Sequence, residues 1–245
     1  MQLHKSIRVK IICLFLGLSS VLAYAQVNDK LKAALQKQLG PNAQIKSLSQ
    51  SMIPGLLEVV VNNSIFYTDL QGKYLLQGEM IELKTGTNLT ELRETELNKI
   101  KWSDLPLQNS IKVVRGDGSR KLAVFADPNC GYCKRLEKTF MEMDNITIYT
   151  FLMPILSPDS TVKSKQIWCS SDASKAWVNW MISGTIPNGK QDCATPLDKN
   201  IALGKSFNIS GTPAIFFLDG SRIPGAASKE AIEKKLSSIN NPLTK

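Results

Sequence analysis

Two cysteines separated by two residues are the side chains in this sequence best suited to chemistry. Cys130 and Cys133 follow an apolar, strand-like run over 122–126. After them, apolar side chains recur at three- and four-residue intervals, at Leu136, Phe140 and Met143. This spacing predicts a helix with one stripe against a core, beginning at Cys130, where free N–H groups and the helix dipole stabilise a thiolate. The pattern predicts a redox dithiol: Cys130 attacks disulfides and Cys133 releases the trapped substrate.

The residues around the two cysteines are expected to tune the thiolate. Gly131 and Tyr132 lie between the cysteines and shape the local electrostatics. Lys134 and Arg135 add positive charge, although two such residues also describe an ordinary solvated helix face. Asp127, three residues before the first cysteine, has two interpretations: it tunes the thiol, or it caps a turn.

The first 25 residues have the three parts of a secretory signal: a basic start, an apolar stretch and Ala23-Tyr24-Ala25. We expect cleavage after Ala25 and a soluble, exported mature protein, because no later run approaches about 18 continuous apolar residues. Removing this segment lowers the formal charge of +9 by 3. The remaining basic residues are scattered, so no nucleic-acid surface is expected.

Removal of the signal also changes the inventory of reactive side chains. The one histidine, His4, and one of the five cysteines, Cys13, leave with it. Without histidine, Ser-His-Asp and Cys-His catalysis and mixed Cys/His zinc sites are excluded. Four cysteines remain, an even number of the kind expected in an exported protein.

The second pair of cysteines, Cys169 and Cys193, is assigned to a structural disulfide. The two residues flank an expected helix, and closing such a loop contributes roughly 3 to 3.5 kcal/mol on the chain-entropy model. A four-cysteine zinc site is the competing interpretation. It is weakened because the second pair lacks the close Cys-x-x-Cys spacing and because such sites suit reducing compartments better. No metal or other cofactor is predicted. Three tryptophans in this part of the chain are interpreted as packing residues: Trp168, Trp177 and Trp180.

The mature chain is predicted to be an α+β protein with a small N-terminal domain over 26–86 and a linker region over 87–109. The N-terminal domain should hold a short helix that stops at Gly40-Pro41 and a small sheet. Four runs are expected to form that sheet: Leu56–Val61, Ser64–Thr68, Tyr74–Leu76 and Met80–Leu83. A domain of this size buries little by itself, so a symmetric dimer is expected. A linker helix is predicted from Asn88 to Lys101.

The second domain is predicted over 110–245, as a strand-helix-strand half followed by a hairpin and a helix. Its expected strands are Leu122–Ala126, Ile146–Leu152 and Ala214–Leu218, with a helical insertion that carries Cys169 and Cys193. Gly211-Thr212-Pro213 stands just before the third strand. Because proline cannot donate to a strand ladder, this position needs a special turn, such as a cis peptide.

The Cys-Gly-Tyr-Cys motif together with Gly211-Thr212-Pro213-Ala214 resembles the thioredoxin fold. The whole layout resembles the periplasmic disulfide isomerases of the DsbC type, with Ile167-Trp168-Cys169 and the approach from Ala202-Leu203-Gly204 to Pro213 as further matches. Pro128-Asn129 departs from the residues more usual before the first cysteine. We expect this difference to shift the balance between the reduced and oxidised dithiol.

The resemblance implies a homodimer joined through the N-terminal domains, with both dithiols facing a cleft for misfolded exported proteins that carry non-native disulfides. It implies that Cys130 attacks, Cys133 resolves, and Thr212-Pro213 lays a substrate strand beside them. It also implies a periplasmic location and a membrane reductase of the DsbD type as partner. The expected function is a disulfide isomerase and reductase. The alternatives are a dithiol oxidase that donates disulfides, and a holding chaperone or copper-binding dimer.

Overall fold

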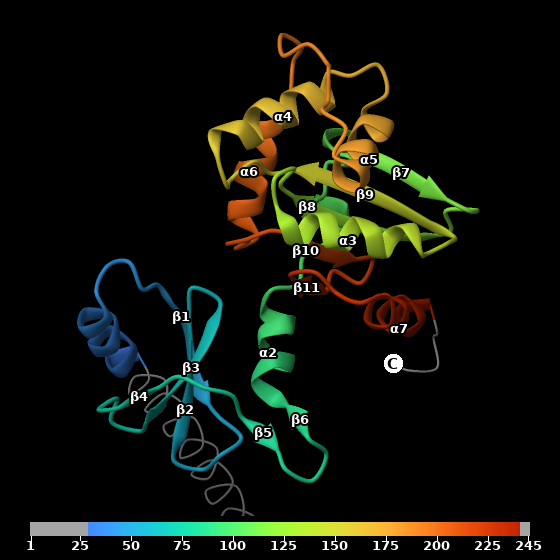
Figure 1. The fold of residues 1–245 in the computed structure, drawn as a ribbon. Helices are drawn as coiled ribbons and strands as arrows, with labels where there is room; N and C mark the ends of the chain where they lie inside the picture. The colour runs from blue at the N-terminus through green and yellow to red at the C-terminus, as the bar shows by residue number, and fades with distance from the viewer. Residues whose placement is uncertain (1–28, 241–245) are drawn as a thin grey trace, which may run out of the picture. The chain divides into compact units, whose positions relative to one another are not determined.

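The computed structural model describes residues 29–240, and the chain divides into two compact units, one up to Glu94 and one from Thr95 (Figure 1). The division falls within helix α2 (Leu89–Leu97). Among the described residues, no helix has the length and apolar character needed to cross a membrane. The predicted signal segment and its cleavage site after Ala25 lie outside the described residues.

The first unit packs a helix over 29–39 on an antiparallel sheet in the order β1-β2-β3-β4. The strands are β1 (Ile45–Gln50), β2 (Leu56–Val61), β3 (Ser64–Asp69) and β4 (Leu75–Leu76). Asn62 and Asn63 form the β2–β3 turn with positive φ of 51° and 72°, the conformation of a tight hairpin turn that asparagine tolerates. Leu35 of the helix packs with Val59 and Val61 of β2, so the helix covers one face of the sheet.

Two predictions for the end of this region were wrong. The segment predicted as a sheet strand over Met80–Leu83 forms a separate hairpin, β5 (Ile81–Glu82) with β6 (Thr87–Asn88), because the chain turns back where the Gly86 amide donates to the Glu82 carbonyl at 2.8 Å. The helix predicted to reach Lys101 ends at Leu97. Beyond it, the amide of Ile100 donates to the carbonyl of Gly220 at 3.1 Å instead of to a preceding helical turn.

The contact between Ile100 and Gly220 needs a glycine. Gly220 has a φ of +79°, and a Cβ atom there would lie 1.9 Å from the carbonyl oxygen of Ile100. A side chain at this turn would therefore push away the segment that follows α2. Two 3₁₀ turns complete that segment, η1 (Trp102–Asp104) and η2 (Leu107–Asn109).

The second unit is built on a five-stranded sheet in the order β11-β10-β8-β9-β7. The strands are β7 (Ile111–Arg115), β8 (Arg120–Ala126), β9 (Ile146–Leu152), β10 (Ala214–Phe217) and β11 (Arg222–Pro224). β8 and β9 run parallel with Phe125 opposite Phe151, and the other pairs are antiparallel. The three predicted strands are therefore central, and β7 and β11 extend the sheet on either side.

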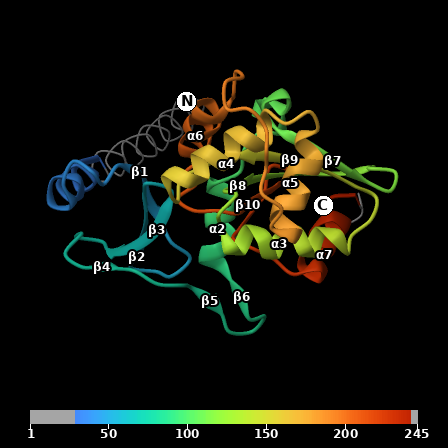
Figure 2. The ribbon, with the colours of Figure 1, turned by 45° about the horizontal axis from the view of Figure 1, so that its top comes forward.

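Helices cover both faces of this sheet (Figures 1 and 2). Alternate residues of a strand point to opposite faces. In β8, Leu122 and Val124 pack with α3 (Gly131–Met141), α5 (Ala173–Ser183) and α7 (Lys229–Asn240), whereas Ala123 and Phe125 pack with α6 (Leu197–Ser206) and the 3₁₀ turns. β8 is thus buried on both sides, which explains its continuous apolar run and gives the residues after it a rigid base.

The helical insertion lies between β9 and β10 and consists of α4 (Pro158–Trp168), α5 and α6. Ser157 caps α4 and Asp172 caps α5, each accepting the amide of the residue three positions on. α5 packs against both α3 and α4 (Figure 2). The insertion is therefore joined to the helix that begins at the dithiol.

Candidate active site

The two cysteines lie where strand β8 passes into helix α3. The buried carboxylate of Asp127 shapes this turn: it accepts the amide of Asn129 at 2.8 Å and the amides of Ile155 and Leu156 at 2.8 and 3.0 Å. These three N–H groups explain why a carboxylate is buried here, because each replaces a bond to water. Of the two interpretations of Asp127, these contacts match that of a turn residue.

Cys130 is the N-cap residue of α3. Its sulfur accepts the amide N–H of Cys133 at 3.3 Å, and its thiol faces the carbonyl oxygen of Thr212 at 3.2 Å. Cys130 is 5% exposed and Cys133 is 2% exposed, and both are free thiols. The sulfur of Cys130 therefore lies at the unpaired N–H groups and the positive end of the helix dipole.

Cys133 has a different environment one helical turn further on. Burial raises the pKa of the Cys133 thiol well above its usual range, and the neighbouring Cys130 raises it further. The side chain of Thr212 acts in the opposite direction. Cys133 is therefore held as a buried, neutral thiol.

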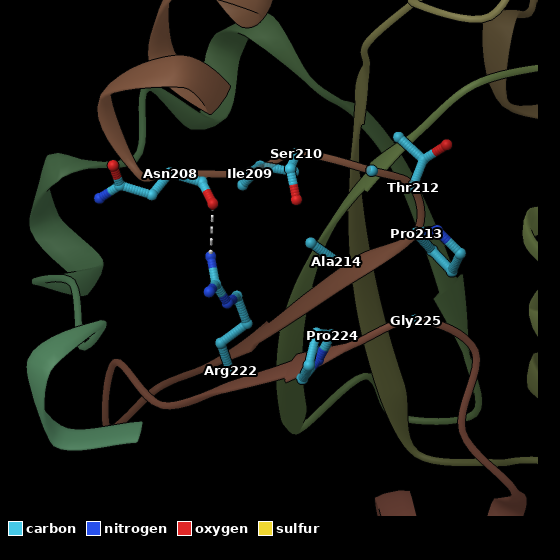
Figure 3. A pocket seen from close by; sticks show the side chains of 10 residues that line it. Asn208, Ile209, Ser210, Thr212, Pro213, Ala214, Arg222, Pro224 and Gly225 are labelled. Atoms are coloured by element: carbon cyan, nitrogen blue, oxygen red, sulfur yellow. Dashed lines mark hydrogen bonds between the residues drawn. The ribbon is translucent and has the colours of Figure 1, made fainter. Parts of the chain in front are cut away.

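Thr212 and Pro213 bring a distant segment to the dithiol. The peptide bond between them is cis, and Pro213 directly precedes β10, the neighbour of β8. On the side of this loop lies a cavity of about 330 Å³, walled by the loop over 208–214 and by β11 (Figure 3). Arg222 fixes the cavity's far end, since its guanidinium donates to the carbonyls of Phe207 and Asn208. The loop thus presents its main chain to the dithiol beside an open hollow.

The residues between the cysteines are accessible. Gly131 is exposed and has no atoms near the position of a Cβ, and Tyr132 is 60% exposed. The guanidinium of Arg135 lies 5.1 Å from the centre of the Tyr132 ring, and the ammonium of Lys134 lies 4.4 Å from that of Trp180. The two basic residues that follow the dithiol are therefore engaged with aromatic rings.

The second pair of cysteines is bonded. The sulfurs of Cys169 and Cys193 are 1.98 Å apart and the Cα atoms 5.9 Å apart, and the bond joins the end of α4 to the loop before α6. Trp168 adds a hydrogen bond from its indole N–H to the carbonyl of Ala194 at 3.2 Å. Because these two sulfurs bond to each other, they are not ligands of a zinc ion shared with the dithiol.

Sequence reasoning missed Glu137, a charged residue buried in α3 one turn beyond Cys133. Its carboxylate accepts the indole N–H of Trp177 at 3.1 Å, while its other oxygen has no hydrogen-bond partner. Burial raises the pKa of Glu137, and the Trp177 bond and the charge of Arg115 offset part of that rise. The available signal was its spacing: Glu137 follows Cys133 by four residues and therefore shares its helix face.

Comparison with known proteins agrees with this arrangement. Residues 107–240 match the family model described as "Thioredoxin-like domain", and residues 23–91 match "Disulfide bond isomerase protein N-terminal domain". The fold and the dithiol thus define the second unit as thioredoxin-like. With both domains in this order, the chain belongs to the DsbC-type family of thiol:disulfide interchange proteins.

Individual proteins similar to this chain are named as disulfide interchange proteins. The chain is 46% identical over 182 residues to the "Probable thiol:disulfide interchange protein DsbC" of Bordetella pertussis, a match that covers 74% of this chain and spans 65% of that protein. It is 26% identical over 219 residues to the "Thiol:disulfide interchange protein DsbC" of Escherichia coli, covering 86% and 89%. A crystal structure of a disulfide interchange protein from Neisseria gonorrhoeae is 39% identical, with a TM-score of 0.53, and covers 55% of this chain and 97% of that one.

Proposed function

We propose that this protein is a disulfide isomerase and reductase, with Cys130 as the attacking thiol and Cys133 as the resolving thiol. The observation that carries the proposal is the position of the Cys130 sulfur, between the Cys133 amide at the helix N-terminus and the Thr212 carbonyl. The amide and the helix dipole stabilise the thiolate that attacks disulfides. Family membership supports the same chemistry.

The reaction begins when the Cys130 thiolate attacks one sulfur of an incorrect substrate disulfide. A mixed disulfide forms, the substrate S–S bond breaks, and the other substrate sulfur leaves as a thiolate. If that thiolate attacks a different substrate disulfide and the newly freed sulfur attacks the mixed disulfide, Cys130 is released unchanged and no net electrons move. If rearrangement stalls, Cys133 gives up its proton and attacks the Cys130 sulfur. The substrate then leaves as a reduced thiol, and Cys130 and Cys133 are left joined in a disulfide.

The raised pKa of the Cys133 thiol suits its role as the resolving thiol. A resolving thiol that ionised readily would expel the substrate before it could rearrange. Holding Cys133 as a buried thiol prolongs the mixed disulfide and so favours isomerisation over reduction. Gly131, Tyr132 and Thr212-Pro213 support the site, because Gly131 leaves space over the dithiol and the loop at Thr212 presents main-chain groups to an extended substrate.

The proposal also includes the domain division, the assembly, the location and the partners. The division we propose is a signal peptide over 1–25, a dimerisation domain over 26–86, a linker region over 87–109 and the catalytic domain over 110–245. The first unit exposes apolar side chains at Leu75, Leu76 and Leu83, which supports a homodimer. The proposed location is the periplasm, the substrates are misfolded exported proteins, and the reductant is a membrane protein of the DsbD type.

The test is the refolding of scrambled ribonuclease in a redox buffer, with the protein compared with its Cys130→Ser variant. Recovery of ribonuclease activity with the protein and not with the variant is the expected result. If the protein forms disulfides in reduced ribonuclease but does not rearrange scrambled ones, it is an oxidase and the proposal fails. Full recovery with Cys130→Ser would instead indicate a holding chaperone.

A further inference from the structure

The helical insertion contacts the turn before Cys130 at two points. The indole N–H of Trp180, on α5, donates to the carbonyl of Pro128 at 2.6 Å. The side-chain amide of Asn129 donates to the carboxylate of Asp159, on α4, at 2.8 Å. Pro128 and Asn129 are the two residues that separate Asp127 from Cys130, so each is held by a different helix of the insertion.

Two lysines join these contacts into one network. The ammonium groups of Lys134 and Lys163 lie 4.4 and 4.9 Å from the centre of the Trp180 ring. Lys163 also pairs with the carboxylate of Asp159 at 2.5 Å. Cations near an aromatic ring fix the ring's position. Trp180 is therefore held in place while its N–H holds the Pro128 carbonyl, and Asp159 is held while it accepts from Asn129.

We propose that Trp180 and Asp159 are positioning residues of the dithiol, which hold the Pro128-Asn129 turn and thereby set the equilibrium between the reduced and oxidised dithiol. This inference rests on the proposed function, since it takes Cys130 and Cys133 as the exchanging pair. Neither residue touches the reacting sulfurs. Both act through the main chain and side chain of the two residues before Cys130.

The physical reason is a difference between the two redox states. In the oxidised state the bond between Cys130 and Cys133 holds the first sulfur at the helix N-terminus. In the reduced state that position depends on the turn, which keeps the Cys130 sulfur within reach of the Cys133 amide. Loosening the turn therefore weakens the reduced state more than the oxidised state, and shifts the dithiol towards the disulfide at a given ratio of glutathione to its disulfide.

The first experiment measures the equilibrium constant with glutathione for Trp180→Phe. Trp180→Phe removes one hydrogen bond, which should lower the equilibrium ratio of reduced to oxidised protein about three- to tenfold. Trp168→Phe is the matched control, because it removes an indole N–H bond to a main-chain carbonyl in the same insertion, at Ala194 rather than at the dithiol turn. An unchanged constant in Trp180→Phe, or an equal shift in both variants, would overturn the proposal.

The second experiment changes Asn129, which is half-buried, and Asp159, which is exposed, so that little core packing is lost. Asn129→Ala and Asp159→Ala should each lower the constant by about two- to fivefold. In the double variant the effect should be less than the sum of the two, because both changes remove the bond between these side chains, although Asn129 also contacts Ser157 and Asp159 also pairs with Lys163. Asp159→Asn retains an oxygen that accepts from Asn129 and should restore most of the equilibrium. Additive effects, or no recovery with Asp159→Asn, would contradict the positioning role.

These results are separable from those of the proposed function. The glutathione equilibrium measures the redox balance of the dithiol whether or not the protein rearranges substrate disulfides. If Cys130-dependent refolding is observed while Trp180→Phe leaves the equilibrium unchanged, this inference alone fails. If the equilibrium shifts as expected but refolding does not depend on Cys130, the isomerase proposal alone fails.

Discussion

The thiol of Cys130 and the carbonyl oxygen of Thr212 lie 3.2 Å apart, although 82 positions separate them in the chain. This contact joins the first turn of α3 to the loop that leads into β10. Together with the Cys133 amide on its other side, it leaves the Cys130 sulfur only a small exposed surface. The cavity over 208–214 lies on the same loop, so the loop at Thr212 borders both the Cys130 sulfur and an open hollow.

The unequal environments of the two thiols predict unequal alkylation. In the reduced protein at neutral pH, iodoacetamide should modify Cys130 at least about tenfold faster than Cys133, because burial raises the pKa of Cys133 and the thiolate is the reacting species. Peptide mass spectrometry after short reaction times distinguishes the two sites. Unfolding the protein in urea should equalise the rates, and equal rates in the folded protein would contradict the assignment.

The buried carboxyl of Glu137 predicts a dependence of stability on pH. Because burial raises its pKa, the folded protein binds this proton to higher pH than the unfolded chain does. The stability contributed by protonated Glu137 is therefore full below the ordinary carboxyl pKa and is lost as pH rises through the raised value.

Replacing this side chain tests that relationship. Glu137→Gln keeps an oxygen for the Trp177 N–H and should raise the free energy of unfolding at pH 7 by roughly 1 kcal/mol, with little effect at pH 4. Urea unfolding at the two pH values measures the difference. Glu142→Gln, on the exposed end of the same helix, is the control. A larger gain at pH 4 than at pH 7 would have the wrong sign.

The disulfide between Cys169 and Cys193 predicts a loss of stability without loss of redox chemistry. In the double variant Cys169→Ser, Cys193→Ser, the free energy of unfolding should be about 3 kcal/mol lower, as expected for a loop of 24 residues. Tryptophan fluorescence reports on the second unit, because all four tryptophans of the sequence lie beyond Thr95. The glutathione equilibrium of Cys130 and Cys133 should stay within twofold, by rough estimate. A loss below about 1 kcal/mol would argue against a structural role for this bond.

The edge of the first sheet predicts the effect of added charge on the proposed dimer. β4 is an edge strand whose two leucines, Leu75 and Leu76, are exposed. Light scattering at micromolar concentration should give a dimer for the unaltered protein and a monomer for Leu75→Glu, Leu76→Glu, since charges on an edge strand prevent pairing. Leu92→Glu, at an exposed position of α2, should remain dimeric. A monomeric unaltered protein would exclude the dimer.

The parts of the fold that could be predicted from sequence have strong local signals. β9 was predicted with its observed limits, Ile146–Leu152, because every residue in it is apolar, β-branched or aromatic, the types that favour strands. β1 and β7 were missed, since Ile45–Gln50 and Ile111–Arg115 mix apolar and polar residues and become strands through their partners, β2 and β9. The linker helix was predicted too long, because the bond between Ile100 and Gly220 is invisible to a local pattern.

The same distinction applies to the candidate site. The dithiol and the Thr212-Pro213 loop could be predicted because each is a motif within a few residues. The network around Trp180 could not, because its members come from α3, α4 and α5 and meet only in the folded chain. Trp180 was interpreted as a packing residue, and it does pack against the core, but its N–H bond to Pro128 has no signal in the sequence.

The boundary at Glu94 has a consequence for how such proteins can diversify. Each contact described above for Cys130 and Cys133 comes from residues between Asp127 and Thr212, all within the second unit. The first unit can therefore be exchanged or lost during evolution without removing any of these contacts to Cys130 and Cys133. Gene fusion at this boundary would give the same dithiol a new assembly partner, so that quaternary structure and redox chemistry could evolve as independent traits.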